Sequence, residues 1–487
     1  MASSEDKKVE MFFLPWIVAR GHMIPMIDAA RLFASYGVKV TILTTHDNLQ
    51  LFQNGVDRDR SLGRDIDFLT FELPEGCENL LSIFTINWNE EQLFIEKLRE
   101  PIEQILRDRR PDCLVSDMFY PWTAESGARL GIPRIVFHVT GLFPSCCEEA
   151  TRRHAPQHKV DSDKATFALP GLPNPNHNIE FTRLKMPSFH TTEPKGAKLA
   201  EAIVDAELKS HGVIINSYYN LEAPYAEYFK NDMGRKLWLV GPVFLFNKNY
   251  EEKAQRGENN SIDGVTILNW LDTKEPKSVL YVSFGSQVRM APEQFFVLAE
   301  ALEASGHSFI WVARYMPESG EHEEEGSGRR VLPEGFEERM TKSGKGLIVR
   351  SWAPQLLILE HRAMGGFMTH CGWNSTVEGI CACLPMITWP LAAEQFFIES
   401  LVVDVLKTGI RVGNEEWMAL HWEPKVTVTR EKVETAVKRL MGGGGEVEEM
   451  RRRARELSEK ANKAVEPGGS SDADVVGLIN ELKSCRK

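Results

Sequence analysis

The stretch that decides the fold occupies residues 352–395 and reads WAPQLLILEHRAMGGFMTHCGWNSTVEGICACLPMITWPLAAEQ. Inside it, the apolar run at 366–369 leads through HCGWNS at 370–375 into a helical pattern at 376–381. These features predict a strand, a tight turn and a helix N-terminus. Gly372 lets the backbone approach a ligand closely, and the first N–H groups of a helix favour an anion such as a diphosphate.

Four side chains extend this predicted anion site toward a nucleotide. His370 and the hydroxyl of Ser375 add hydrogen-bond donors beside the helix N-terminus. Glu378, one turn further along, is able to accept from two vicinal hydroxyls such as those of a ribose. Trp352 offers a flat face for a base such as uracil. Taken singly, each of these residues has an ordinary structural interpretation as core, capping or backbone-bonded residue.

Strand-like apolar runs alternate with helical patterns on both sides of this stretch. The runs lie at 10–14, 38–43, 113–116, 134–137, 212–216, 278–284, 308–312, 346–349, 366–369 and 385–388. Such alternation predicts parallel sheets covered by helices. A chain of 487 residues exceeds what one hydrophobic core usually supports, so we predict two Rossmann-like, doubly wound α/β domains.

A polar segment without apolar period separates the two series of strands. It runs from Asn247 to Ile262 and follows the turn Gly241-Pro242. We therefore expect an N-terminal domain over 1–245, a linker over 246–262 and a C-terminal domain over 263–460. Residues 461–487 are expected to form a helix that packs back on the N-terminal domain.

Composition and charge exclude several classes of protein. The net charge is −12, and no stretch combines clustered Lys and Arg with aromatics, so nucleic-acid binding is not expected. The polar N-terminus does not resemble a signal peptide, and no apolar run is long enough to span a membrane. The eight cysteines show no disulfide framework. We expect a cytoplasmic protein without stable membrane insertion, and a monomer because no heptad stripe appears.

As a whole, residues 352–395 resemble, without a gap, the 44-residue signature box of the plant family 1 UDP-sugar-dependent glycosyltransferases. The resemblance covers nearly the whole chain, including FTRL at 181–184. It implies the GT-B architecture, in which two Rossmann-like domains face each other across a cleft. The C-terminal domain would hold the UDP-sugar and the N-terminal domain the acceptor. UDP-glucose would be the donor substrate, without a cofactor or a metal.

The resemblance also assigns the donor-binding residues. Gln355 and the backbone of Ala353 would lie beside the base, and Asn374 would join the diphosphate site with Ser286, which ends the turn SFGS at 283–286. Glu394, where many relatives carry Asp, and Gln395 match the pair that binds the sugar hydroxyls, and Gln395 favours glucose. The full donor set is Ser286, Trp352, Ala353, Gln355, His370, Gly372, Trp373, Asn374, Ser375, Glu378, Glu394 and Gln395.

Two further residues carry the predicted chemistry. His22 lies in the first turn of the helix that follows the first strand, and Asp117 ends the strand CLVSD at 113–117. Both positions belong to the carboxyl edge of a parallel sheet, where ligands bind in open α/β folds. A carboxylate there is able to fix the tautomer of a histidine that acts as a general base. Alternatively, His22 is a helix-start residue and Asp117 caps the helix near 122–130.

The resemblance favours the first interpretation, because family members carry this His and Asp as the catalytic pair. His22 would remove the acceptor proton, and the oxygen would attack the anomeric carbon from the face opposite UDP, which gives a β-glycoside. Arg20 departs from the small residue or Pro of many relatives. Aromatic stretches at 84–88, 118–122, 140–143 and 186–189 suggest a flat, apolar acceptor. The predicted acceptor-binding residues are Phe84, Trp88, Met118, Phe119, Thr140 and Phe189.

The predicted function is therefore glucosyl transfer from UDP-glucose to a hydroxyl or carboxyl group of a small lipophilic plant metabolite. A triterpenoid, steroid or flavonoid acceptor agrees best with the resemblance. No G-x-G-x-x-G follows a predicted strand, and no G-x-S-x-G elbow is present, which argues against a dinucleotide oxidoreductase and a serine hydrolase. Two alternatives stay open: a different donor, UDP-glucuronic acid or UDP-galactose, and a non-catalytic UDP-sugar-binding protein.

Overall fold

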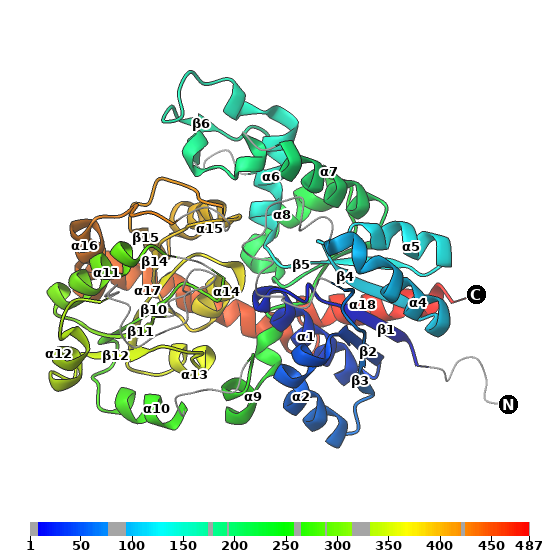
Figure 1. Ribbon diagram of the computed structural model, residues 1–487, viewed down its shortest axis with the longest axis horizontal. Coiled ribbons are helices and arrows are strands. Elements are labelled where there is room, and N and C mark those ends of the chain that lie inside the picture. Colours follow the sequence, from blue (N-terminus) through cyan, green and yellow to red (C-terminus); the bar gives the residue numbers. More distant parts are fainter. Residues whose placement is uncertain are drawn as a thin grey trace. The chain divides into compact units, whose positions relative to one another are not determined.

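The computed structural model describes residues 8–75, 94–173, 179–191, 194–257, 264–287, 290–313, 332–419 and 424–486 (Figure 1). The chain forms two compact units. Unit 1 comprises Met1–Cys146, Thr192–Glu258 and Lys460–Lys487, and unit 2 comprises Cys147–Thr191 and Asn259–Glu459. Among the described residues, no helix combines the length and apolarity needed to cross a membrane.

Unit 1 is built on a parallel sheet of seven strands in the order β3-β2-β1-β4-β5-β8-β9. The strands are β1 (Glu10–Leu14), β2 (Lys39–Thr44), β3 (Ile66–Thr70), β4 (Cys113–Asp117), β5 (Arg134–His138), β8 (Gly212–Ile215) and β9 (Leu237–Leu239). In register, Phe12 of β1 pairs with Thr41 of β2 and with Leu114 of β4. The order reverses between β1 and β4, so the carboxyl ends of these two strands form the switch point at which open α/β sheets bind ligands.

Helices lie on both faces of this sheet, with α1 and α2 on one side and α4 and α5 on the other (Figure 1). The helices of unit 1 are α1 (Arg20–Ser35), α2 (His46–Ser61), α4 (Arg99–Arg109), α5 (Trp122–Leu130), α7 (Pro194–Leu208), α8 (Tyr219–Asn231), α9 (Tyr250–Ala254) and α18 (Ser470–Ser484). Helix α18 packs against β9, where Ser471 donates to the carbonyl of Gly241. Helix α18, within the segment 461–487 that we expected to return to the N-terminal domain, thus contacts β9 at the edge of the sheet of unit 1.

Unit 2 contains a parallel sheet of six strands in the order β12-β11-β10-β13-β14-β15. The strands are β10 (Val279–Ser283), β11 (Ser308–Val312), β12 (Gly346–Val349), β13 (Met364–Thr369), β14 (Met386–Thr388) and β15 (Gly409–Arg411). Its helices are α10 (Gly264–Asp272), α11 (Pro292–Ser305), α12 (Phe336–Lys342), α13 (Gln355–Leu359), α14 (Trp373–Cys381), α15 (Gln395–Ser400), α16 (Arg430–Met441) and α17 (Gly445–Val465). The switch point of this sheet lies between β10 and β13.

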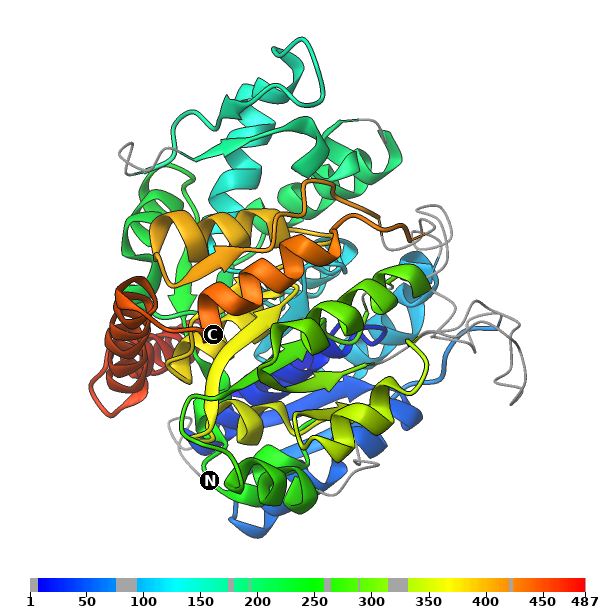
Figure 2. The ribbon, with the colours of Figure 1, turned by 90° about the vertical axis from the view of Figure 1, so that its left-hand side faces the viewer.

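The core of unit 2 follows from the two-residue period of its strands. Leu280 and Val282 of β10 pack with α11 and α16, which lie side by side (Figure 2). Tyr281 points to the other face, where its hydroxyl donates to the side chain of Gln355 at 3.3 Å. Alternate side chains of one strand therefore build the core on one face and reach a predicted donor residue on the other.

Residues 147–191, which we expected in the N-terminal domain, group with unit 2. This segment contains the end of α6 (Leu142–His154) and the hairpin of β6 (Phe167–Ala168) and β7 (Glu180–Phe181). The ring of Phe181 packs edge-on against Phe397, with centroids 5.1 Å apart. The backbone N–H of Trp417 donates to the carbonyl of Leu184 at 2.7 Å. These contacts explain the grouping, since they tie the segment to α15 and to the chain after β15.

Candidate active site

His22 and Asp117 meet at the switch point of the first sheet. The chain leaves β1, turns, and enters α1 at Arg20, so that His22 lies in the first helical turn, while Asp117 is the last residue of β4. The Nδ1 atom of His22 lies 2.8 Å from Oδ2 of Asp117. The carboxylate is fully buried, and the imidazole side chain is 15% exposed. One ring edge of the histidine is thus anchored, and the ring still reaches the surface.

The carboxylate of Asp117 is held from a second direction. Its Oδ1 atom accepts a hydrogen bond from the backbone N–H of Phe119 at 3.0 Å. Helix α5 has Pro121 as its N-cap, without a side-chain capping bond, so Asp117 does not cap that helix. With Nδ1–H donating to Asp117, the neutral imidazole carries its lone pair on Nε2. This geometry is the one that a general base and its orienting carboxylate require.

Aromatic side chains surround this pair within unit 1. The ring of Phe119 lies 5.4 Å from that of His22, and Trp16 contacts Phe119 at 5.5 Å and Tyr120 at 5.2 Å between centroids. Sequence reasoning included Phe119 but missed Trp16. The available signal was its position two residues after β1, at the carboxyl edge of the sheet.

The other predicted acceptor residues are dispersed. Met118 is half-buried, and Thr140 is buried with a hydroxyl that no described residue hydrogen-bonds. Phe84 and Trp88 lie outside the described residues. Phe189 belongs to unit 2, where its ring contacts His190.

In unit 2, His370 and two glycines occupy the switch point between β10 and β13. A Cβ at Gly285, whose φ is +75°, would lie 2.8 Å from the His370 ring, and a Cβ at Gly372 would overlap it. The Nδ1 atom of His370 is buried, and no described residue hydrogen-bonds it. Burial lowers the pKa of His370 to about 4, so the ring is neutral at pH 7.

Helix α14 begins directly after this histidine. Its N-cap is Gly372, which supplies no side-chain capping bond, and the preceding Cys371 adopts a left-handed φ of +65°. The first N–H groups of a helix have no acceptor within the helix. The helix end and the neutral His370 ring together form a site with the chemistry that a diphosphate requires.

A hydrogen-bonded group next to this helix end contains three of the predicted donor residues. The amide of Gln355 donates to Glu378 Oε2 at 2.6 Å and to the Ser375 hydroxyl at 3.2 Å. Glu378 is only 4% exposed. We expected Gln355 beside the base; here it orients the carboxylate of Glu378, with Ala353 and the half-buried Trp352 just before it in the chain.

The remaining predicted donor residues lie in separate turns of unit 2. The carboxamide oxygen of Gln395 accepts from the N–H groups of Leu391 and Ala392 at 2.8 and 2.9 Å, which leaves its NH₂ group to act as donor. Ser286 follows β10, and Glu394 precedes α15; both are half-buried. The indole of Trp373 is buried in the core at 2% exposure, so this residue has only its backbone to offer a ligand.

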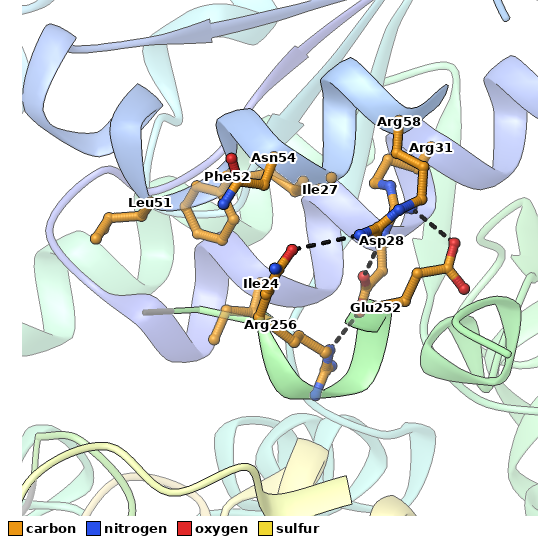
Figure 3. Close-up of a pocket in the computed structure, with 12 residues that line it drawn as sticks. Ile24, Ile27, Asp28, Arg31, Leu51, Phe52, Asn54, Arg58, Glu252 and Arg256 are labelled. Atoms are coloured by element: carbon orange, nitrogen blue, oxygen red, sulfur yellow. Dashed lines mark hydrogen bonds and ion pairs between the residues drawn. The ribbon is translucent and has the colours of Figure 1, made fainter. Parts of the chain in front are cut away.

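The structure also contains a cavity in unit 1 between α1, α2 and α9 (Figure 3). Arg31 bonds Asp59 through Nε at 2.6 Å and Asn247 through Nη1 at 2.6 Å, and Arg256 bonds Asp28 at 2.7 Å. None of the predicted catalytic or donor residues lines the cavity. Together with the ion pair between Arg31 and Glu252, these bonds connect α1 to the segment around α9.

Comparisons with known proteins show which family the chain resembles. Residues 264–443 match the family model described as UDP-glucoronosyl and UDP-glucosyl transferase. The chain is 47% identical over 479 residues to the abscisate beta-glucosyltransferase of Phaseolus angularis, covering 98% of this chain and 97% of that protein. It is 43% identical over 490 residues to the anthocyanin 3'-O-beta-glucosyltransferase of Gentiana triflora, covering 98% and 99%.

A solved structure extends the comparison to the fold. The crystal structure of Glycyrrhiza uralensis UGT73P12, complexed with glycyrrhetinic acid 3-O-monoglucuronide, superposes with a TM-score of 0.89. The two chains are 41% identical, and the match covers 98% of this chain and 96% of that one. The predicted class, α/β with two Rossmann-like domains, is confirmed by this match and by the two parallel sheets.

Proposed function

Because the chain belongs to the UDP-glucuronosyl and UDP-glucosyl transferase family, as its full-length relatives show, we propose that it transfers glucose from UDP-glucose to a small lipophilic plant metabolite. The reacting group is a hydroxyl or a carboxyl, and the product is a β-glucoside. The observation that carries the proposal is the 2.8 Å bond between His22 and the fully buried Asp117. A protein that merely binds UDP-sugars has no need of such a pair.

The proposed reaction begins with the acceptor. When the acceptor group is a hydroxyl, the Nε2 atom of His22 takes its proton, and Asp117 stabilises the imidazolium that forms. The acceptor oxygen then attacks the anomeric carbon from the face opposite the leaving UDP, so the configuration inverts. The new carbon–oxygen bond forms as the bond from the anomeric carbon to the diphosphate breaks.

The leaving diphosphate acquires negative charge during this step. We propose that the N-terminal end of α14 and a hydrogen bond from His370 stabilise it, since preorganised donors are most effective where charge develops. Glu378, oriented by Gln355, binds the ribose hydroxyls, and Trp352 stacks on uracil. Glu394 and the NH₂ group of Gln395 hold the sugar.

The range of acceptors is also part of the proposal. One relative is named for abscisate, a carboxylic acid, and another for an anthocyanin. The solved structure contains a triterpenoid glucuronide. With the aromatic groups around His22, these names favour a triterpenoid, steroid or flavonoid acceptor. UDP-glucuronic acid and UDP-galactose are the competing donors, and a cytoplasmic monomer stays our prediction for location and assembly.

The test is a product assay by mass spectrometry. UDP-glucose and the two competing donors are each offered with triterpenoid, steroid, flavonoid and phenolic acceptors. We expect a mass gain of one hexose with UDP-glucose. A mass gain seen only with UDP-glucuronic acid or UDP-galactose would show that this sugar nucleotide, and not UDP-glucose, is the donor. No mass gain alongside measurable UDP binding would favour the non-catalytic interpretation.

A further inference from the structure

Arg134, the first residue of β5, is a buried arginine that forms no ion pair with any residue that the structure describes. It is only 3% exposed. Burial lowers the pKa of Arg134 to about 10, and the negative charges of Glu207 and Asp117 oppose this shift, so the side chain is charged at pH 7. A buried charge is costly unless hydrogen bonds compensate it. The partners of this guanidinium therefore indicate what it is for.

The guanidinium of Arg134 bonds hydroxyl and backbone oxygens. Its Nε donates to the hydroxyl of Ser116 at 2.9 Å, and its Nη1 donates to the hydroxyl of Ser210 at 2.8 Å. Its Nη2 points to the turn after β4, where the carbonyl oxygens of Asp117 and Tyr120 lie at 3.4 and 3.5 Å. One side chain thus contacts the last two residues of β4 and the turn that follows them.

The turn after β4 is tied to both members of the proposed catalytic pair. Asp117 carries the carboxylate that bonds Nδ1 of His22. The hydroxyl of Tyr120 donates to the carbonyl of Pro15 at 3.3 Å and accepts from the backbone N–H of Ile17 at 3.4 Å. These two partners belong to the loop between β1 and α1, the helix that carries His22. A displacement of the turn would therefore move the carboxylate and the loop together.

The charge of Arg134 also complements that of Asp117. Among the described residues, Asp117 forms an ion pair only with His22, which is charged only when it is protonated. The positive charge of Arg134 attracts the carboxylate without an ion-pair contact. Both carboxylate oxygens consequently stay available, one for His22 and one for the backbone N–H of Phe119. A purely apolar side chain at this position would supply neither the charge nor the bonds to the turn.

We propose that Arg134 is a positioning residue of the reaction, which holds the turn after β4 and thereby fixes the carboxylate of Asp117 against His22. The inference rests on the proposed function, since it takes His22 and Asp117 as the catalytic pair. Because Arg134 acts through Asp117, its loss should lower kcat and leave the binding of UDP, which we propose for unit 2, unchanged.

The first test is a double-mutant cycle on the full chain, with the donor and acceptor that give the largest product gain. Arg134→Met should lower kcat by roughly 10- to 100-fold at unchanged Kd for UDP, as expected for a misplacement of about 1 Å. In Asp117→Asn, where the carboxylate is already lost, the same change should lower kcat by less than about twofold. Arg134→Lys, which keeps the charge but lacks the planar fork, should retain part of the activity.

Arg31→Met is the matched control for this cycle. Arg31 is a buried arginine of the same unit whose guanidinium bonds Asp59 and Asn247. Its replacement should leave kcat per UDP-binding molecule at the wild-type value, although it lowers stability. If Arg134→Met does not fold, Arg134→Lys takes its place in both tests, with a smaller effect in the same direction.

The second test does not depend on turnover. Hydrogen exchange followed by mass spectrometry measures the backbone amides of residues 118–120, which include the N–H of Phe119 that bonds Asp117. In Arg134→Met these amides should exchange about tenfold faster or more, because the turn opens locally with greater ease. In Arg31→Met they should exchange as in the wild type.

Equal factors of kcat loss in the wild-type and Asp117→Asn backgrounds would overturn the proposal, because Arg134 would then act on stability and not through Asp117. Unchanged amide exchange at 118–120 in Arg134→Met would overturn it as well, since the turn would not depend on this side chain. Absence of glucosyl transfer by the wild type would instead contradict the proposed function. Faster exchange in Arg134→Met would then still show that Arg134 holds the turn.

Discussion

The imidazole of His22 and the carboxylate of Asp117 are joined by a 2.8 Å hydrogen bond, although 95 residues separate them in the chain. The bond exists because β1 and β4 are neighbours in the sheet and the chain order reverses between them. It places a lone pair on Nε2 and a buried negative charge behind Nδ1. The first prediction concerns this arrangement.

Asp117→Asn should lower kcat by roughly 10² to 10⁴ while UDP binding stays nearly unchanged, because a carboxamide does not stabilise the imidazolium. His22→Ala should lower kcat by a similar factor for lack of the base. Steady-state kinetics and calorimetric titration with UDP check both effects. His46→Ala, at an exposed histidine of α2, should behave as wild type. Normal turnover by His22→Ala would disprove the general-base assignment.

Gln355→Leu should weaken UDP binding by about tenfold, because Glu378 would lose the 2.6 Å bond that orients it. Calorimetric titration with UDP measures the change, and the KM for the acceptor should stay constant. The matched control is Glu338→Gln, which alters an exposed carboxylate on α12. Unchanged UDP affinity in Gln355→Leu would mean that Glu378 does not need this partner.

Gly285→Ala and Gly306→Ala provide a matched pair. Both glycines have positive φ, +75° and +73°, so alanine costs about 1 kcal/mol of backbone strain at either position. At Gly306 nothing lies within 4 Å of the new methyl group, whereas at Gly285 it would lie 2.8 Å from the His370 ring. Gly285→Ala alone should impair UDP binding. Equal UDP affinity in the two variants would show that the ring moves aside without consequence.

The stability of the protein should fall as the pH drops from about 6.5 toward 4, in part because of His370. The folded pKa of about 4 lies below the unfolded value, so the unfolded chain binds a proton that the folded chain does not. This histidine accounts for at most about 3 kcal/mol of the loss, which levels off below pH 4. Denaturant unfolding at several pH values checks it. The slope of the free energy of unfolding against pH should be shallower in His370→Gln and unaltered in His46→Gln.

Arg31→Met should destabilise unit 1 by about 3 kcal/mol or more, because it removes a partner of the fully buried Asp59. Denaturant unfolding measures the effect. Lys39→Met is the control. Lys39 pairs with Glu10 at the surface, so its replacement should lower the free energy of unfolding by less than about 1 kcal/mol. Equal losses in the two variants would mean that Arg64, which also pairs with Asp59, replaces Arg31.

Much of the fold was predictable because the inner strands are short, continuous apolar runs. The predicted runs at 10–14 and 308–312 match β1 and β11 in full. The strands β3, β9 and β15, which we did not predict, all lie at a sheet edge. Strand β3 is partly exposed, and β9 and β15 have three residues each, so none has the length and uniform burial that make an apolar run stand out.

The sequence by itself determined the strand, turn and helix around His370, and it placed His22 in the helix that follows β1 and Asp117 at the end of β4. These features depend on local periodicity, turn chemistry and spacing, which one stretch of chain contains. Only the tertiary structure decided that Nδ1 of His22 bonds Asp117, that Gln355 orients Glu378, and that Arg134 bonds the end of β4. Each of these contacts joins separate elements, and their pairing depends on how sheets and turns pack rather than on any local pattern.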